Sequence, residues 1–262
     1  MSIAVIVPFW NAEQWLDRCC ASLSDQDGKF VFVLVDDHST DESFLKACEW
    51  CNKDDRFVLL TNQRTKGVSG ARNTGLDYVG DRINWVTFLD ADDEMLPDAY
   101  NTFRKVIQAD MRANIHQLNH MRYYTRINKL VNKYSNEGGV YRFGKMPVCW
   151  FYVWNKLIRA SWLGDIRFQE GLQYGEDGLF TLDCMFKDNY VHCGDWRLTT
   201  TKHRFDNMES LSRVKRPEDL RQQIDAYVAR FDQQTDKTIL IELAATIASL
   251  WNDAMISRLK AL

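Results

Sequence analysis

The chain has 262 residues, room for one large domain or two small ones, and roughly 70% of its unfolded surface can be buried without a disulfide or metal staple. Hydrophobic residues at 45% and charged residues at 26% exclude an intrinsically disordered chain. With 33 basic and 36 acidic side chains the net charge is −3, which removes the electrostatic basis for a dedicated nucleic-acid-binding protein.

The first hundred residues alternate apolar runs typical of buried strands with stretches of helical spacing. Ser39 and Glu42 are spaced as a capping box at the start of a helix, and Pro97 suits the first turn of another. This alternation predicts parallel strands joined by right-handed crossovers, hence an α/β fold. Strands are expected at 3–8, 30–35, 57–61 and 85–89, and helices at 12–23, after 42, from about 71 and near 97.

The pattern changes after residue 115, and no internal repeat follows. Residues 115–125 and 130–143 indicate strands or a hairpin around 136–139, ahead of a tryptophan-rich stretch. A helix is expected at 175–186, one or two strands at 190–202, and two helices from Pro217 onward.

Polar clusters follow three of the expected strands: Asn11, Asp36-Asp37, and Asp90 to Asp93. In a parallel sheet the carboxyl ends of the strands share one edge, and ligands bind outside that edge. The sequence therefore places its binding site there.

The D-x-D formed by Asp90 and Asp92 has two explanations. Two carboxylates at this spacing on an extended exit can reach a common point and supply the hard oxygen ligands that Mg²⁺ or Mn²⁺ accepts. The other explanation is a solvated acidic loop that precedes the next helix. The D-x-D motif alone does not distinguish between these two explanations.

Two further segments suit nucleotide recognition. Asp36-Asp37 is either an N-cap and turn cluster or a carboxylate that accepts hydrogen bonds from a nucleobase or a ribose. The stretch Gly67 to Asn73 combines flexible backbone with a helix start and the guanidinium of Arg72, which suits a pyrophosphate. It is not a Walker loop, because no G-K-[ST] is present.

Four ordered motifs together resemble the nucleotide-sugar domain of family 2 glycosyltransferases. These are Val5-Ile6-Val7-Pro8-Phe9-Trp10-Asn11, Val35-Asp36-Asp37-His38-Ser39-Thr40-Asp41, Ala71-Arg72-Asn73-Thr74-Gly75-Leu76 and Phe88-Leu89-Asp90-Ala91-Asp92-Asp93. The resemblance covers residues 3–110 closely and 150–213 loosely. It implies the GT-A fold: a Rossmann-like, mixed but mostly parallel sheet flanked by helices, here with a C-terminal helical extension.

The resemblance implies roles for the donor half. Pro8 and Asn11 would border the nucleotide, and Asp36, followed by Asp37, would contact uracil. Arg72 would lie near the ribose and diphosphate. In Asp90-Ala91-Asp92, Asp90 would touch the ribose or a metal-bound water and Asp92 would bind the metal. Trp10 replaces the family's usual tyrosine, which keeps the aromatic ring but loses its hydroxyl.

The acceptor half carries two further motifs that resemble the family. Trp154-Asn155-Lys156 matches its W-N-K segment, and Glu176-Asp177 matches the acidic helix start that lines the acceptor site. In the family's inverting mechanism one carboxylate of that pair is the general base, for which we expect Asp177, with Glu176 as the alternative. An acidic pair in a first helical turn also has a purely structural explanation. His203 is a candidate third metal ligand or a structural histidine.

These implications combine into one expected enzyme. A sugar would pass from a UDP-sugar to a glycan or lipid-linked acceptor, with Mn²⁺ or Mg²⁺ as cofactor, in bacterial surface-glycan synthesis. Residues 1–110 would form the nucleotide-sugar-binding half, 111–215 the acceptor-binding half of the same domain, and 216–262 a helical extension. The apolar face of the last helix would pack on the domain, form a homodimer or touch a membrane surface; it consists of Leu240, Leu243, Ile247, Leu250, Trp251 and Ala254.

The seven cysteines and the chain start favour a reducing, cytoplasmic setting. Cys48 and Cys51 form a C-x-x-C without a second pair at zinc-like spacing, which favours incidental thiols over a metal or redox site. Residues 1–8 are too short for a signal peptide. Two other functions stay open from the sequence alone: a sugar-phosphate nucleotidyltransferase, whose glycine-rich opening is missing after Val7, and a non-catalytic nucleotide-sugar-binding relative.

Overall fold

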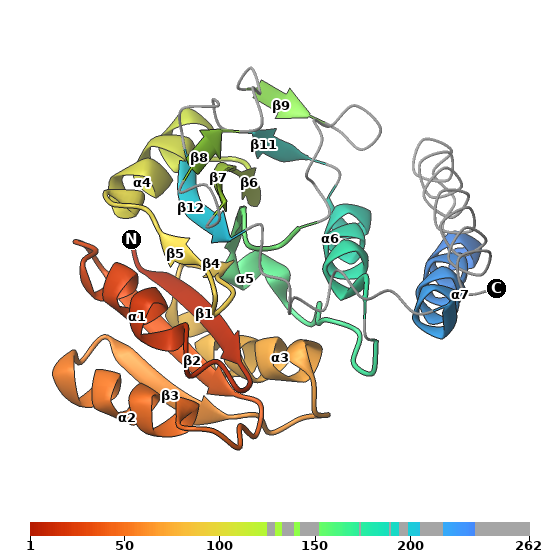
Figure 1. Ribbon diagram of the computed structural model, residues 1–262. Coiled ribbons are helices and arrows are strands. Elements are labelled where there is room, and N and C mark those ends of the chain that lie inside the picture. The colour runs from red at the N-terminus through yellow and green to blue at the C-terminus, as the bar shows by residue number, and fades with distance from the viewer. Residues whose placement is uncertain are drawn as a thin grey trace.

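The computed structural model of the protein describes residues 1–124, 129–132, 139–141, 152–172, 174–188, 190–193, 199–204 and 217–233. Strands and helices alternate through the first hundred residues and form a sheet flanked by helices (Figure 1). The α/β prediction is confirmed. The strands are β1 Ile3–Phe9, β2 Phe30–Asp36, β3 Phe57–Thr61, β4 Trp85–Phe88, β5 Glu94–Met95, β6 Ile115–Gln117, β7 Asn119–Tyr124, β8 Lys129–Asn132, β9 Gly139–Tyr141, β10 Lys156–Arg159, β11 Val191–Cys193 and β12 Thr199–Arg204. The helices are α1 Leu16–Ser24, α2 Ser43–Lys53, α3 Val68–Val79, the 3-10 turn η1 Gly80–Arg82, α4 Ala99–Ala109, α5 Ala160–Leu163, α6 Glu176–Lys187 and α7 Pro217–Gln233.

The main sheet has eight strands in the order β3-β2-β1-β4-β10-β6-β11-β9. β1 pairs in parallel with both β2 and β4, and β2 pairs in parallel with β3. β10 is inserted antiparallel between β4 and β6. Because β10 runs the other way, its first residue, Lys156, lies at the edge where β1, β2 and β4 end.

A second sheet of four strands, in the order β5-β12-β7-β8, adjoins the first. β7 and β8 are antiparallel, with Tyr124 opposite Lys129, whereas β9 pairs with β11 in the main sheet. The predicted hairpin around 136–139 is therefore wrong, because the strands on its two sides belong to different sheets. Residues 133–138 themselves lie outside the described part of the chain.

Alternate residues of β1 feed two separate cores, as expected of a strand that is buried on both faces. Ile3, Val5 and Val7 pack with residues of α1, α2 and α4, whereas Ala4 and Ile6 pack with α3 and α6. Ala226 and Tyr227 of α7 join the core that contains Ala4 and Ile6, and α7 lies on the outer side of α6 (Figure 1).

Three helix starts differ from the prediction. α1 begins at Leu16 rather than Ala12, after a turn in which the backbone N–H groups of Trp15 and Leu16 both bond to the Ala12 carbonyl. α2 begins at Ser43, so the Ser39–Glu42 capping box is wrong.

The hydrogen bonds around α2 explain that difference. Ser39 Oγ accepts the backbone N–H of Asn11, while Asp41 Oδ1 accepts the N–H and hydroxyl of Ser43. The third difference is α4, which begins at Ala99 after Asp98 in the left-handed region (φ 62°), so Pro97 lies outside its first turn.

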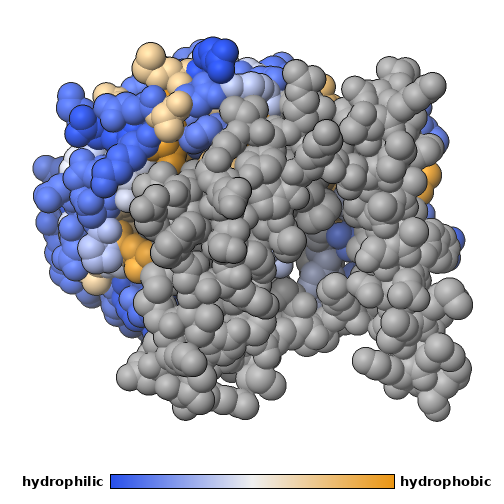
Figure 2. Space-filling model, turned by 90° about the horizontal axis from the view of Figure 1, so that it is seen from above, coloured by the Kyte–Doolittle hydropathy of each residue, from blue (hydrophilic) through white to orange (hydrophobic). Residues whose placement is uncertain are grey.

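The face of the molecule in Figure 2 has no broad apolar patch among its described residues. In the space-filling view most described atoms are hydrophilic, with apolar atoms in small separate groups (Figure 2). Within the described ranges no helix is long and apolar enough to cross a bilayer. The apolar helix face expected at 240–254 lies outside those ranges, and the six cysteines inside them are free thiols.

Helix α3 approaches its neighbours so closely that two glycines are required. A Cβ on Gly75 would lie 2.6 Å from Ile6 Cγ2 of β1, and one on Gly70 would lie 1.9 Å from the carbonyl oxygen of Thr65. Gly70 thus lets the helix lie directly against the loop of residues 62–67. This contact matters for the site, because α3 carries Arg72.

Replacing Gly70 with alanine should lower the free energy of unfolding by about 1–3 kcal/mol, because the loop backbone has to move to admit the methyl group. Chemical denaturation followed by far-UV circular dichroism measures the change. Ser69→Ala is the matched control: the Ser69 hydroxyl is buried and has no hydrogen-bond partner among the described residues, so its removal should be neutral or stabilising. Equal stabilities of the two variants would contradict the close approach.

Candidate functional site

The carboxyl edge of the sheet gathers the polar residues that follow β1, β2 and β4. Asn11, with φ 48°, turns away from β1 and joins the segment after β2: its Oδ1 accepts the backbone N–H of Thr40 at 2.8 Å. Pro8 is buried in β1 opposite Val35 of β2. The strand exits are thus bonded to one another rather than independent.

The two aspartates after β2 have different surroundings. Asp37 uses both carboxylate oxygens within the protein: Oδ1 accepts Nδ2 of Asn62 at 2.6 Å and Oδ2 accepts the N–H of Gly67 at 2.8 Å. Asp36 accepts the N–H of Ser39 at Oδ1, and the described residues provide no bond to its Oδ2. Asp36 therefore makes the local turn bond with one oxygen and keeps the other for a ligand, whereas Asp37 holds the loop of residues 62–67.

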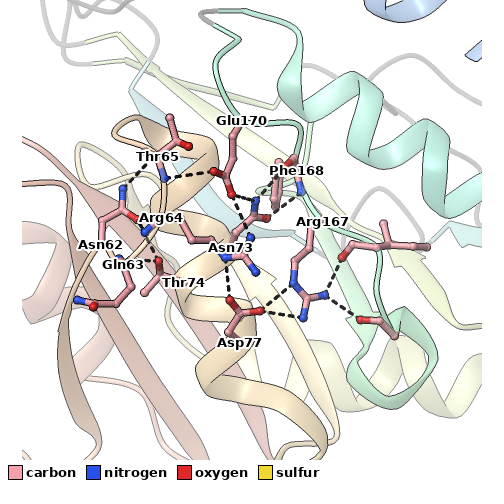
Figure 3. Close-up of polar contacts among 12 residues, drawn as sticks. Asn62, Gln63, Arg64, Thr65, Asn73, Thr74, Asp77, Arg167, Phe168 and Glu170 are labelled. Carbon is pink, nitrogen blue, oxygen red and sulfur yellow. Dashed lines mark hydrogen bonds and ion pairs between the residues drawn. The ribbon is translucent and has the colours of Figure 1, made fainter. Parts of the chain in front are cut away.

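A polar network fixes the loop of residues 62–67 against the segment before α6 (Figure 3). Glu170 is its centre: its carboxylate accepts the N–H of Thr65 (3.2 Å), Nδ2 of Asn73 (3.0 Å) and Nη1 of Arg64 (3.2 Å). Arg64 also pairs with Asp77. Through Thr65, the network reaches the loop that Asp37 holds from the other side.

Asn73 completes the attachment of α3. Its side chain donates to the carbonyl of Phe168 (2.9 Å) and accepts the N–H of the same residue (2.8 Å), as Figure 3 shows. Arg167 pairs with Asp77 one turn further along the helix. α3 is therefore joined to residues 167–170 by four side chains, and its position relative to α6 is set.

The loop after β4 is anchored from α1 and from the second sheet. Nη2 of Arg18 donates to the carbonyl of Asp92 at 3.0 Å, and its Nε pairs with Glu94 at 2.8 Å. Glu94 also pairs with Lys202 of β12. Ala91 is buried within this loop, which fixes the path of the chain between Asp90 and Asp92.

Arg72 of α3 joins the donor and acceptor motifs. Its side chain is 4% exposed, and its guanidinium contacts three carboxylates: Nη2 with Asp90 at 3.0 Å, and Nη1 with Glu176 at 3.0 Å and Asp177 at 2.6 Å. These partners raise the pKa of Arg72 against the opposing effect of burial, so it stays charged. The structure thus brings Asp90 and the acidic pair of α6 to one guanidinium.

Asp177 lies at the start of α6, after Gly175 in the left-handed region (φ 80°). Its Oδ2 accepts the N–H of Val153 at 3.3 Å. Burial raises the pKa of the Asp177 carboxyl, and the charges of Glu176 and Asp90 raise it further, while Arg72 opposes them. A carboxylate with a raised pKa is a stronger base, which suits proton abstraction.

The W-N-K segment lies beside Asp177 but is largely inside the protein. Trp154, Asn155 and Lys156 are 5%, 1% and 1% exposed. Lys156 Nζ donates to Asn155 Oδ1 and to the carbonyl of Tyr152. The exposed aromatic at this position is Tyr152, whose ring stacks on Trp154 with centroids 5.0 Å apart.

The carboxylates after β4 have the chemistry that Mg²⁺ or Mn²⁺ requires. Asp90 and Asp92 supply hard oxygen atoms, and these ions take their remaining positions from water and phosphate. Within the described ranges no group of three or more His, Cys, Asp and Glu side chains surrounds a common point. Two carboxylates fit an ion that would complete its coordination with water and phosphate oxygens.

His203 is described only through its backbone, in β12 directly after the Lys202–Glu94 pair. The strand thus passes the loop that holds Asp92. Its ligand role stays a prediction, and the basic residues Arg213 to Arg216 lie outside the described ranges.

Residues 4–170 match the family model of glycosyl transferase family 2. The chain is 33% identical over 193 residues to glycosyltransferase GlyA of Streptococcus pneumoniae, covering 67% of this chain and 27% of that protein. It is 37% identical over 92 residues to an Escherichia coli protein named UDP-Glc:alpha-D-GlcNAc-diphosphoundecaprenol beta-1,3-glucosyltransferase WfgD, covering 35% of each.

Solved structures show the same fold. S. aureus TarS 1-349 in complex with UDP-GlcNAc superposes with a TM-score of 0.76 at 20% identity, over 93% of this chain and 72% of that one. The match to the family model shows that the chain belongs to glycosyl transferase family 2, with the GT-A fold. It spans about a quarter to a third of the length of the curated relatives named above.

Sequence reasoning missed Glu170, Asn62 and Tyr152. Glu170 and Thr65 are 105 residues apart, and no local spacing links them. Asn62 directly follows β3 at the same edge as Asp36, so its place after a strand was a usable signal. Tyr152 stands two residues before Trp154, and the aromatic pair was visible within the tryptophan-rich stretch.

Glu170→Gln should weaken the fall in the free energy of unfolding that occurs between neutral and acidic pH. Burial raises the pKa of Glu170, but hydrogen bonds from Thr65 and Asn73 and the Arg64 guanidinium outweigh it and lower the pKa to about 2. The stability that this carboxylate contributes is present above its ordinary value of 4.5 and is lost as the pH falls towards 2.

Unfolding free energies between pH 7 and pH 2 measure this effect, which we expect to be no more than about 2 kcal/mol for a partly exposed group. Glu49→Gln is the control, because Glu49 is exposed on α2 and pairs only with Lys53 at 3.8 Å. A Glu170→Gln profile parallel to the wild-type profile would contradict a stabilising network around this carboxylate.

Proposed function

We propose that this protein transfers a sugar from a UDP-sugar to a hydroxyl group of a glycan or lipid-linked acceptor, with inversion at the anomeric carbon. The observation that carries the proposal is the contact of one guanidinium with Asp90 on the donor side and Asp177 on the acceptor side. Membership of glycosyl transferase family 2 favours glycosyl transfer over nucleotidyl transfer.

Asp177 is the proposed general base. It accepts the proton of the acceptor hydroxyl while the hydroxyl oxygen forms a bond to the anomeric carbon and the bond from that carbon to the diphosphate oxygen breaks. Attack from the face opposite the leaving group inverts the anomeric configuration. The raised pKa of Asp177 makes it a competent acceptor of that proton near neutral pH.

On the donor side, Asp36 and Asn11 would border the nucleotide. Asp36 offers Oδ2 to a uracil N–H, and the exposed Trp10 ring, with Lys66 Nζ 5.4 Å from its centroid, lies at the same edge. Asp90 and Asp92 would hold Mn²⁺ or Mg²⁺ at the diphosphate. Such an ion stabilises the negative charge that grows on the leaving group.

On the acceptor side, the exposed ring of Tyr152 supports binding of a sugar beside Asp177, since aromatic faces offer a flat apolar surface. The similarity to WfgD, and to the Campylobacter jejuni GalNAc(5)-diNAcBac-PP-undecaprenol beta-1,3-glucosyltransferase, supports a lipid-linked acceptor in surface-glycan synthesis. The GT-A structure neighbour with bound UDP-GlcNAc supports a UDP-sugar donor.

The test is UDP release from a set of UDP-sugars by the purified protein with Mn²⁺ or Mg²⁺, with and without glycan acceptors. We expect slow hydrolysis of one donor without acceptor and metal-dependent UDP binding. A protein that binds UDP with metal but turns over no donor would be the non-catalytic relative. One that does neither would contradict the proposal.

Asp177→Asn should lower kcat by about 10²–10⁴-fold, the usual contribution of a general base, and leave UDP binding nearly intact. Turnover and calorimetric titration with UDP measure the two effects. Asp183→Asn, on the same helix but paired with Arg230, is the control and should keep turnover. Loss of UDP binding in Asp177→Asn would assign this residue to the donor instead.

Asp92→Ala should weaken metal-dependent UDP binding as well as turnover, because Asp92 would be a ligand of the ion that binds the diphosphate. Titrations with UDP in the presence of Mn²⁺ and of EDTA separate the metal-dependent part. Asp55→Ala removes an exposed aspartate in the turn before β3 and should bind as wild type does. Metal-dependent binding that survives Asp92→Ala would move the ion away from this loop.

A further inference from the structure

Arg72 contacts the residues that flank the reaction rather than open solvent. We infer that Arg72 is a positioning residue, which holds Asp177 in the orientation that accepts the proton and ties it to the donor-side carboxylate of Asp90. This inference rests on the proposed function. It assigns Arg72 a different task from the diphosphate contact that the sequence resemblance implies.

The carboxyl group of Asp177 is held from two sides. Nη1 of Arg72 bonds to Oδ1 at 2.6 Å, and the N–H of Val153 bonds to Oδ2 at 3.3 Å. Two bonds on different oxygens fix the plane of the carboxyl group. The rate depends strongly on how the base is oriented, since a misplacement of about 1 Å can lower the rate about 10²-fold.

The guanidinium is itself held in place. It lies 5.2 Å above the ring of Phe168, and that ring stacks on Phe180 of α6 at 4.0 Å. Both backbone polar groups of Phe168 bond to Asn73, the neighbour of Arg72 on α3. The same residues therefore fix α3, the guanidinium and α6 in one frame.

The burial of Arg72 argues against a direct diphosphate contact. Its side chain is 4% exposed, Nη1 contacts Glu176 and Asp177, and Nη2 contacts Asp90. Only a planar fork can bond to Asp90 through one nitrogen and to Asp177 through another. The ammonium of a lysine retains the charge but cannot span both.

The experiment compares Arg72→Lys with Arg56→Lys. Arg56 is the matched control because it also bonds through its fork to a carboxylate, that of Asp54, in the turn before β3. Arg72→Lys should lower kcat about 10²-fold with the UDP dissociation constant and the donor KM unchanged. Unchanged UDP binding also shows that the variant is folded.

A double-mutant cycle with Asp177→Asn tests the route of the effect. If Arg72 acts through Asp177, Arg72→Lys causes no further loss of turnover in the Asp177→Asn background. A further 10²-fold loss in that background would overturn the inference. So would an Arg72→Lys protein that keeps kcat but binds UDP more weakly, since that result identifies a diphosphate contact.

A readout that needs no turnover separates this inference from the proposed function. If the wild type turns over no UDP-sugar, the proposed function fails. The contact between Arg72 and Asp177 can then still be tested by carboxyl-carbon NMR of Asp177. Arg72→Met should raise the pKa of the Asp177 carboxyl, because the opposing cation is gone, while Arg56→Met should leave it unchanged. Equal pKa values in the wild type and Arg72→Met would overturn the contact.

Discussion

The burial of one positive charge determines how the site is assembled. Removing a guanidinium from water strongly destabilises the folded state unless negative groups lie close to it. Arg72 finds them on the loop after β4 and on the first turn of α6. These segments are far apart in the chain, and Arg72 is the residue at which they meet.

The parallel direction of the strands brings the polar residues that follow them to the same region. β1, β2 and β4 are parallel and deliver Asn11, Asp36 and Asp90 to one edge, as the apolar runs and the polar residues after them predicted. Where helices begin was less predictable. The Ser39–Glu42 spacing fits a capping box, yet Ser39 bonds to Asn11 across 28 residues, and a tertiary bond of that kind leaves no local pattern.

The candidate site was predicted as residues but not as contacts. Asp36 ends β2 at the carboxyl edge, and Arg72 contacts Asp90 and Asp177. The partner of each charge could not be read from spacing, since Arg72 and Asp177 are 105 residues apart. For the same reason the two aspartates after β2 were indistinguishable by sequence, and only the bonds from Asn62 and Gly67 separate them.

Residues in the strand β10 and residues in the turn before it can be varied with different consequences. Its ladder with β4 and β6 holds the sheet together, whereas the turn just before it, from Tyr152 to Asn155, borders Asp177. A graft confined to that turn would alter the surface beside Asp177 and leave β1 to β4 untouched. Under the proposed function, chimaeras exchanged at this junction are a route to new acceptor preferences.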